Sequence, residues 1–462
     1  MRSEYMLFKY TTIFLVILAT CLRLVSLNQS LWLDEAIGAT LVRNQSAGYI
    51  WNSFARADTH PPLYYIVLEF WSVFFGFSEV ALRLPSVIAG VLTVFVTYLI
   101  GKEFISQRAG FLAGLLMATS GLNIYYSQEA RMYALSTLLT AVVVFFYAKK
   151  WWYLLSLAVL ALAATDYLPM LIILVVFVWE MLAKSTKKHT LAFLLSLLPT
   201  IGFYIYWADT LFSQIRSTTV YLGQNMWWSS LIGFSDIKSI ALVWTKFTLG
   251  RISFDDPFLY ALITLIVSLP IAWLLMRGVL SGKGYRFLIW LTLPLVISFL
   301  TALKFPGFSY FRLGFLLVPF YLLIANGLIQ KGVSNTIAIV LVCVNLVFAL
   351  CYLLVPQFHR EDWRGLVAFV EANTKNNEYV FVNYSEPFTP YVWYATRPNQ
   401  MLVFSHNKLA GMQSFYTLDY LLDATDPNGD MFAKIKNLGY QETNIYNFRG
   451  TGQLRYWQAL DN

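Results

Sequence analysis

The chain has 462 residues, of which 58% are hydrophobic, 17% aromatic and only 13% charged. Soluble domains carry roughly 25% charged residues, so this composition excludes a soluble globular enzyme and predicts a polytopic α-helical membrane protein. The net charge of +8 comes from basic residues scattered in short loops, which excludes a nucleic-acid-binding face.

Apolar stretches follow one another along the chain, and most are near the ~20 residues that cross a bilayer as a helix. The stretches 61–76 and 151–165 are the short ones. The full set is 8–27, 61–76, 83–101, 109–126, 132–148, 151–165, 167–183, 190–207, 258–276, 285–303, 312–330 and 335–355.

Basic residues decide which of these stretches cross. If 61–76 lies along the outer interface, strict alternation places every short basic loop on the cytoplasmic side, as the positive-inside bias requires. If 61–76 crosses, all later loops are inverted. The sequence His60-Pro-Pro62 at its start also suits an interfacial helix. We therefore predict about eleven transmembrane helices, with the N-terminus inside and the C-terminus outside.

The first polar feature on the predicted outer face is the acid pair Asp34 and Glu35, directly after the first apolar stretch. Adjacent carboxylates at the rim of a bilayer cost desolvation energy unless they are hydrated, paired or catalytic. Asp34 is placed to act as a general base, as glycosyl transfer requires. The alternative is that Asp34 caps a helix over 36–43.

Further polar residues fall on the same face. His60 suits either a phosphate or metal contact or a structural role, and Asp166 is either a turn residue or a site residue. Arg131, two residues after Glu129, could hold a phosphate through its planar fork or extend to lipid headgroups. Tyr310 and Arg312, which follow Lys304, suit either a lipid phosphate or an interfacial belt.

From residue 356 the charged fraction rises, and the pattern changes to short strands over 379–383 and 400–404 with a helix over 362–370. This predicts a transmembrane domain over 1–355 and a small extracytoplasmic α/β domain over 356–462. The chain contains no nucleotide-binding fingerprint. A site on the outer face has no access to cytosolic nucleotide sugars, so an activated donor must arrive through the membrane.

The order of these motifs resembles the GT-C membrane glycosyltransferases, and in particular the branch of protein O-mannosyltransferases and aminoarabinose lipid A transferases. The resemblance is clearest over 8–190 and weaker over 285–330. Its motifs are the acid pair after the first span, His60-Pro-Pro-Leu63, Arg83-Leu-Pro-Ser86, Tyr126-Ser-Gln-Glu-Ala-Arg-Met-Tyr133 and the arginine-bearing entry to a late span.

The resemblance implies a polyprenyl-phosphate-linked monosaccharide as donor and, usually, inversion at the anomeric carbon. By carry-over, Asp34 is the catalytic base, and Glu35 either supports it or helps to organise the acceptor. His60, Glu129, Arg131 and Asp166 line the donor cavity, and Tyr310 and Arg312 bind the lipid phosphate. Segment 61–76 matches the family's juxtamembrane helix. A divalent metal is left open, and no other cofactor is implied.

The chain departs from the family in two ways. It has no clear counterpart of the glutamate–lysine pair in the first outer loop of the aminoarabinose transferases. It also lacks the inserted β-trefoil domain of the mannosyltransferases, which weakens an assignment to protein O-mannosylation.

The leading hypothesis is a cell-membrane enzyme, in the plasma or inner membrane, that transfers a hexose or pentose on the extracytoplasmic face. The acceptor is a glycan, a lipid or a protein. Two alternatives stay open: an oligosaccharide ligase or polymerase with a pyrophosphate-linked donor, and a transporter of lipid-linked sugars. Paired half-repeats, which are common in transporters, are not evident in the sequence.

Overall fold

The computed structural model describes residues 2–183, 185–224, 236–304, 307–374, 378–409 and 411–460. The chain forms two compact units. The helical unit consists of Met1–Leu27, Gln45–Asn225 and Ile232–Phe358. The described part of the α/β unit comes from Asn28–Asn44 and His359–Asn462. This unit includes residues 28–44, which the sequence prediction assigned to the transmembrane domain over 1–355.

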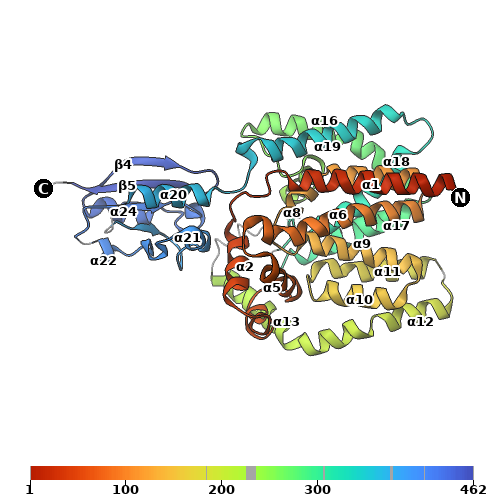
Figure 1. Ribbon diagram of the computed structural model, residues 1–462, viewed down its shortest axis with the longest axis horizontal. Helices are drawn as coiled ribbons and strands as arrows, with labels where there is room; N and C mark the ends of the chain where they lie inside the picture. Colours follow the sequence, from red (N-terminus) through yellow and green to blue (C-terminus); the bar gives the residue numbers. More distant parts are fainter. Residues whose placement is uncertain are drawn as a thin grey trace. The chain divides into compact units, whose positions relative to one another are not determined.

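Helices make up nearly all of the described helical unit (Figure 1). In chain order they are α1 (Arg2–Leu24), α3 (Ala47–Tyr49), η1 (Ile50–Phe54), α4 (Ala55–Ala57), α5 (Leu63–Phe75), α6 (Glu79–Phe104), α7 (Gln107–Thr119), α8 (Gly121–Ser127), α9 (Tyr133–Lys149), α10 (Trp152–Ala163), η2 (Leu168–Met170), α11 (Leu171–Leu182), α12 (Lys187–Ser196), α13 (Leu198–Gln224), α15 (Ile237–Leu249), α16 (Pro257–Leu280), α17 (Tyr285–Thr301), η3 (Gly314–Leu316), α18 (Leu317–Leu328), α19 (Asn335–Leu354) and η4 (Pro356–Phe358).

Local sequence fixes where several of these helices begin. Ser78, Ser106 and Ser120 cap α6, α7 and α8, because each serine side chain accepts a hydrogen bond from the backbone N–H three residues later. Such caps satisfy amide groups that have no partner within the helix. The capped helices therefore start at defined points, which sets the turns between them.

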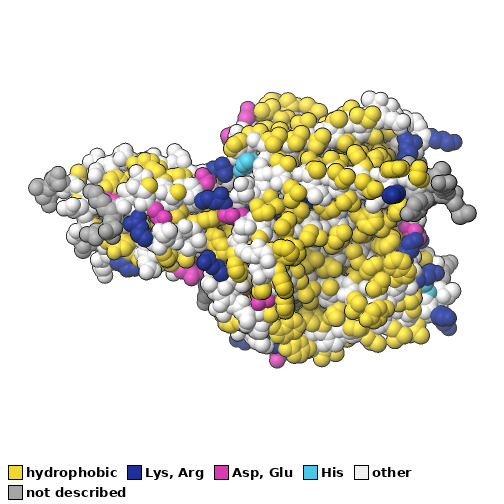
Figure 2. Space-filling view, in the orientation of Figure 1, with side chains coloured by type: hydrophobic (Ala, Val, Ile, Leu, Met, Phe, Trp, Pro, Cys, Tyr) yellow, Lys and Arg dark blue, Asp and Glu magenta, His cyan; other side chains and the backbone are white. Residues whose placement is uncertain are grey.

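Exposed apolar side chains mark the helical unit as a membrane protein. Among the described residues, four helical segments are long and apolar enough to span a bilayer: Glu79–Phe104, Lys187–Ser217, Pro257–Leu280 and Asn335–Leu354. Their outward side chains include Leu269, which is 63% exposed, and Ile339, which is 62% exposed. Figure 2 shows that hydrophobic side chains cover most of the visible face of this unit. Apolar surface of this extent is stable in lipid rather than in water.

Helix α5 is too short to cross. Its 13 residues span about 20 Å, against roughly 30 Å of hydrocarbon core. Phe70 and Phe74 on this helix are exposed, whereas Tyr64 and Leu68 are buried. A short helix with one apolar face outward is what the sequence predicts for the interfacial segment 61–76. The total number of crossings stays a prediction.

The basic loops meet at one end of the helical unit. Lys149 pairs with Glu103 at 2.5 Å, and Lys283 Nζ donates to the carbonyl oxygen of Ile105 at 3.0 Å. Arg277 donates to the carbonyl oxygen of Lys331. Figure 2 shows Lys and Arg side chains gathered at the end of this unit where the N-terminus lies. The loops that the sequence assigns to the cytoplasm therefore share one end, as that topology requires.

The described α/β unit contains one sheet between helices. Its elements are α2 (Leu33–Asn44), α20 (Trp363–Asn373), β1 (Val380–Val382), α21 (Thr389–Tyr394), η5 (Pro398–Gln400), β2 (Met401–Val403), α22 (His406–Leu409), β3 (Ser414–Leu418), α23 (Leu422–Thr425), α24 (Asp430–Asn437), β4 (Tyr440–Asn447) and β5 (Gln453–Ala459). The strand order is β2-β1-β3-β5-β4, with β1 parallel to β2 and β3, and β5 antiparallel to β3 and β4.

Strand β1 is buried on both faces. Val380 and Val382 belong to a hydrophobic cluster that also contains Leu33 and Trp363, whereas Phe381 packs into a second cluster on the other side. A short, continuous apolar run is typical of such a central strand. The strands predicted over 379–383 and 400–404 are confirmed as β1 and β2, and the helix predicted over 362–370 is confirmed as α20.

Candidate functional site

The acid pair lies in the first turn of α2, inside the α/β unit. The helix begins at Leu33, and the backbone N–H of Ala36 donates to the carbonyl oxygen of Trp32 at 2.9 Å. Trp32 is therefore the capping position, and the alternative that Asp34 caps this helix is wrong. Carboxylates in a first turn interact favourably with the helix dipole. Glu35 is fully buried and Asp34 half-buried, so Asp34 is the more accessible acid.

The rest of the α/β unit holds α2 in place. Leu33 is 8% exposed and packs in the cluster that contains Trp363. The backbone N–H of Leu31 donates to Tyr394 Oη at 2.8 Å, and the Arg43 guanidinium lies over the Trp393 ring at 5.2 Å. The helix that carries the acid pair is thus part of the folded C-terminal unit.

The helical unit contains a polar cavity of about 320 Å³. Three of the predicted site residues line it: His60, Asp166 and Arg312. Each of these residues is more than 100 positions from the next along the chain, so only the fold brings them together. The other lining residues are Thr59, Tyr133, Tyr167, Leu168, Leu171, Ile297, Ser298, Thr301, Ala302 and Gly307.

A hydrogen-bonded chain fixes one wall of this cavity. His60 Nδ1 lies 3.3 Å from Asp58 Oδ2, and Tyr65 Oη donates to the same oxygen at 3.4 Å. Arg131 Nη1 in turn donates to Tyr65 Oη at 3.1 Å. Burial alone raises the pKa of Asp58, but the hydrogen bond with His60 and the charges of His60 and Arg131 outweigh it and lower the pKa to about 2. Asp58 is therefore an anion that orients His60.

The second cavity acid, Asp166, has a different environment. Its carboxylate accepts a hydrogen bond from Ser136 Oγ at 3.3 Å and another from the backbone N–H of Leu168 at 3.4 Å. Burial raises the pKa of Asp166, and the charges of His60 and Arg312 oppose this rise. Asp58 and Asp166 are thus held with opposite pKa shifts near one cavity, which is common where charged ligands bind.

Arg312 reaches the cavity from the segment before η3. Its guanidinium lies 6.0 Å from the Phe311 ring centroid, and its buried Nε has no hydrogen-bond partner among the described residues. A buried donor without a partner costs free energy that a bound anion can offset. The cavity therefore offers a donor to an anionic ligand.

Arg131 does not extend to the surface. It is 7% exposed, donates to Tyr65 and lies 5.9 Å from the Tyr133 ring centroid. The alternative that Arg131 reaches lipid headgroups is therefore wrong. Glu129 is 1% exposed and lies in the turn between α8 and α9. Both residues are buried in the helical unit, and neither lines the polar cavity.

Tyr310 belongs to a separate aromatic cluster, built around Arg251. The Arg251 guanidinium lies 5.1 Å from the Tyr125 ring centroid and 5.5 Å from the Tyr310 ring centroid. Tyr126 contacts both Tyr125 and Tyr133, and Tyr133 lines the polar cavity. A row of tyrosine rings therefore connects Arg251 with the cavity.

Lys246 supports the segment that carries Arg251. The amine is 2% exposed and donates to Ile252 O at 2.9 Å, Ser253 Oγ at 2.8 Å and Tyr260 Oη at 3.0 Å. Burial and the charge of Arg251 lower the pKa of Lys246 to about 7. These hydrogen bonds therefore hold residues 251–253 in place.

The sequence did not single out Arg251 as a site residue. It follows Gly250, whose positive φ of 77° ends α15, and no recognised motif surrounds it. Asp58 is next to the His60 motif and could have been found from that spacing. Among the described residues, no three His, Cys, Asp or Glu side chains lie close enough together to hold a metal ion.

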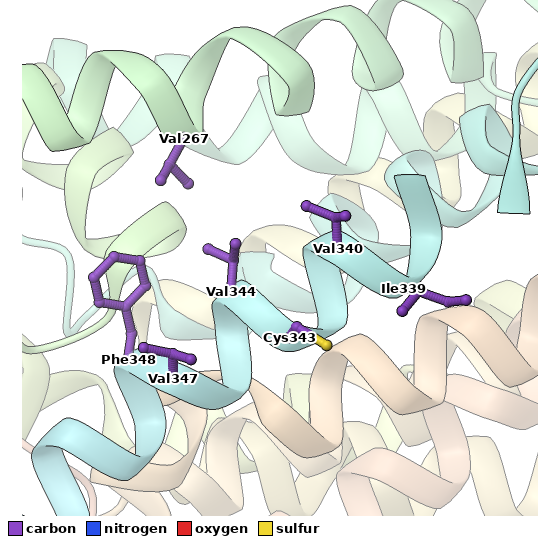
Figure 3. A pocket seen from close by; sticks show the side chains of 7 residues that line it. All are labelled: Val267, Ile339, Val340, Cys343, Val344, Val347 and Phe348. Atoms are coloured by element: carbon purple, nitrogen blue, oxygen red, sulfur yellow. The ribbon is translucent and has the colours of Figure 1, made fainter. Parts of the chain in front are cut away.

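A second hollow, shown in Figure 3, is entirely apolar. It lies between α16 and α19, and one residue of α16, Val267, faces a row from α19. The α19 residues are Ile339, Val340, Cys343, Val344, Val347 and Phe348. Apart from the Cys343 thiol its lining is hydrocarbon, so this groove can accommodate a hydrocarbon chain.

Comparisons with known proteins are consistent with this architecture. Residues 59–207 match the model of a family described as dolichyl-phosphate-mannose-protein mannosyltransferase. The structure of ArnT from Cupriavidus metallidurans bound to undecaprenyl phosphate is similar with a TM-score of 0.55 and 10% identity, covering 98% of each chain. No curated protein sequence matches the chain.

The archaeal oligosaccharyltransferase AglB from Archaeoglobus fulgidus, in complex with an inhibitory peptide and a dolichol-phosphate, is similar with a TM-score of 0.54. Its identity is 12%, and the match covers 97% of this chain and 74% of that chain. The chain therefore shares the fold of these two proteins, and its resemblance to the GT-C membrane glycosyltransferases is confirmed.

Proposed function

We propose that this chain is a membrane glycosyltransferase that moves one monosaccharide from a polyprenyl-phosphate-linked donor to a glycan, lipid or protein acceptor. The observation that carries the proposal is the polar cavity of about 320 Å³ lined by His60, Asp166 and Arg312. The neighbours of known structure support the donor class, since ArnT is bound to undecaprenyl phosphate and AglB to a dolichol-phosphate.

The size and lining of the cavity favour a single sugar. Ligand pockets range over roughly 300–1,000 Å³, and this cavity is at the lower end of that range. Carboxylate and imidazole groups on its wall can bind sugar hydroxyls, and Arg312 can bind an anionic oxygen. A ligase that transfers an oligosaccharide would require a longer cleft.

The reaction that we propose is a single displacement with inversion. Asp34 accepts the proton of the acceptor hydroxyl as that oxygen attacks the anomeric carbon, and polyprenyl phosphate leaves. Glu35 is buried, and its Oε2 accepts a hydrogen bond from the backbone N–H of Trp32 at 3.5 Å, which supports the start of α2. Positive charge near the departing phosphate lowers the barrier by stabilising the charge that develops there.

Two further features suit a lipid-linked donor. Arg251, between the rings of Tyr125 and Tyr310, can neutralise the lipid phosphate together with Arg312. The apolar groove along α19 (Figure 3) runs toward the same end, because Tyr352, one turn after Phe348, packs against Tyr125 in a tilted ring pair. A polyprenyl chain in this groove would therefore place its phosphate near Arg251.

The working location follows from the predicted topology. In this proposal the basic loops face the cytoplasm, and the residues that line the cavity lie on the outer side of the cell membrane. His60, Glu129, Arg131 and Asp166 are assigned to the donor site, and Asp34 and Glu35 to the acceptor proton. A bound divalent metal is not part of this proposal.

The test uses the purified full chain in nanodiscs with a panel of radiolabelled polyprenyl-phosphate monosaccharides and an envelope extract as acceptor. We expect wild type to consume one donor and the Asp34→Asn variant to lose at least about 100-fold of this activity. Asp209→Asn is the control, because Asp209 is an exposed acid outside the proposed site.

Two outcomes would contradict the proposal. Consumption of a pyrophosphate-linked oligosaccharide, with no monosaccharide donor used, would establish the ligase instead. Movement of a labelled lipid-linked sugar across the bilayer without transfer to any acceptor would establish a transporter. Equal transfer by wild type and Asp34→Asn would remove Asp34 from the role of base.

A further inference from the structure

A buried carboxyl group of the C-terminal segment lies next to the acid pair. Glu361 precedes α20, and its Oε2 accepts a hydrogen bond from Trp363 Nε1 at 2.6 Å. Its Oε1 accepts a hydrogen bond from Tyr420 Oη at 3.0 Å. Both donors belong to the hydrophobic cluster that also contains Leu33, the neighbour of Asp34 in the chain.

Backbone contacts join the two segments directly. Ser30 Oγ donates to the carbonyl oxygen of Glu361 at 2.5 Å, and the backbone N–H of Arg360 donates to Gln29 Oε1 at 2.7 Å. A Cβ added to Gly450 would lie 2.9 Å from Glu361 Cγ, so the loop between β4 and β5 closes over this side chain. Glu361 therefore has a fixed place beside the first turn of α2.

We propose that Glu361 is a positioning residue that acts through Asp34: its carboxyl group lies beside the Asp34 carboxylate and tunes its strength as a base. The proposal rests on the proposed function, since it assigns Glu361 a part in the transfer reaction. It gives the C-terminal unit a chemical role in addition to holding α2.

The charges around Glu361 support this role. The titratable and charged groups that face it are Asp34 from α2, the adjacent Arg360, Tyr420 after β3, and Arg449, whose Nε donates to the carbonyl oxygen of Arg360. Burial raises the pKa of Glu361 to about 7, and the charge of Asp34 adds to this rise, whereas the hydrogen bonds from Trp363 and Tyr420 and the charge of Arg360 oppose it.

Two carboxyl groups in one environment titrate as a coupled pair. Below neutral pH Glu361 keeps its proton. When Glu361 loses this proton to solvent at higher pH, the negative charge that it gains favours transfer of the acceptor's proton to Asp34. General-base catalysis benefits from such a charge, so transfer rises by about 3- to 10-fold through this ionisation.

The test is the pH dependence of kcat/KM for sugar transfer by the full chain in nanodiscs. We expect kcat/KM of wild type to rise near pH 7. The Glu361→Gln variant lacks this rise. In Tyr420→Phe, which removes a hydrogen bond to the ionised carboxylate, the rise moves to higher pH. Superimposable profiles for all three proteins would overturn the proposal.

A second readout does not need activity. Infrared difference titration of the same samples identifies the protonated carboxyl band that is missing in Glu361→Gln, and its midpoint gives the pKa of Glu361. We expect this midpoint to fall in Asp34→Asn, because a negative neighbour is removed. An unchanged midpoint would show that the two acids are not paired. A shifted midpoint in a protein that transfers no sugar would support the pair and reject the proposed function.

Discussion

The burial of Glu361 predicts a pH-dependent stability that can be measured without any substrate. Folding raises the pKa of this carboxyl from 4.5 to about 7, so the folded chain holds the proton to a higher pH than the unfolded chain. Below pH 4.5 both states are protonated and the full contribution of the neutral group is present. As the pH rises from 4.5 to 7, only the unfolded state ionises, and stability falls.

The magnitude follows from the size of the shift. Each pKa unit corresponds to about 1.4 kcal/mol, so the change from 4.5 to about 7 costs about 3 kcal/mol of folding free energy across this window. Gln at position 361 has no ionisation to suppress. The stability of wild type relative to Glu361→Gln therefore decreases by about 3 kcal/mol between pH 4.5 and pH 7, and then stays constant.

The assay is denaturant unfolding of the detergent-solubilised full chain, followed by tryptophan fluorescence at several pH values. Trp363, which donates to Glu361, belongs to the unit that is being tested. The difference between wild type and variant cancels the titration of all other groups. Glu386→Gln is the matched control, because Glu386 is an exposed acid of the same unit. A wild-type-minus-variant difference that does not change with pH would refute the reasoning.

Three further predictions concern the helical unit. Val344→Trp fills the apolar groove and raises the donor KM by about 10-fold with kcat unchanged, as measured by initial rates over a series of donor concentrations. The control Leu269→Trp, on an exposed position of α16 outside the groove, leaves KM and kcat unchanged. Arg251→Ala weakens donor binding by about 1.5–3 kcal/mol, because a charge-assisted contact to the phosphate is removed, and the Kd for a polyprenyl phosphate measures this loss. A Kd equal to that of wild type would exclude Arg251 from the phosphate site. Gly327→Val pushes α16 and α18 apart, because a Cβ at Gly327 would lie 2.1 Å from the carbonyl oxygen of Leu274, and we expect a lower midpoint of thermal unfolding. The control Gly202→Val, where no atom lies within 4 Å of the added Cβ, leaves this midpoint unchanged.

Strands of this fold can be predicted from the sequence where their burial requires apolar residues. The run Val380–Val382 is apolar because it forms an inner strand that is buried on both faces, and its pattern therefore identified it. Met401–Val403 is an edge strand, but its three residues are buried or partly buried, so its pattern was apolar as well. Strand β4 (Tyr440–Asn447) lies at the sheet edge with most of its residues exposed, so its composition resembles that of a loop. Polarity alone could not reveal it.

Individual residues of the candidate site could be predicted from the sequence, but the cavity that they line could not. Topology placed His60, Asp166 and Arg312 on the same face, and the fold shows that they line one cavity. Arg251 could not be predicted, because its role depends on two tyrosine rings that approach it from distant segments. The association of α2 with the C-terminal unit depends on the packing of Leu33, and a single leucine carries no such signal in a sequence.

The inclusion of residues 28–44 in the α/β unit has a consequence for biosynthesis. A growing chain places its first outer loop long before the ribosome has made residues 359–460, so Leu33 has no core to enter until translation is nearly complete. Contacts across more than 300 positions form late, because closing so long a loop is slow. A chain that terminates early could therefore insert its helices and still lack an ordered Asp34, so that only a full-length molecule acquires the base that we propose.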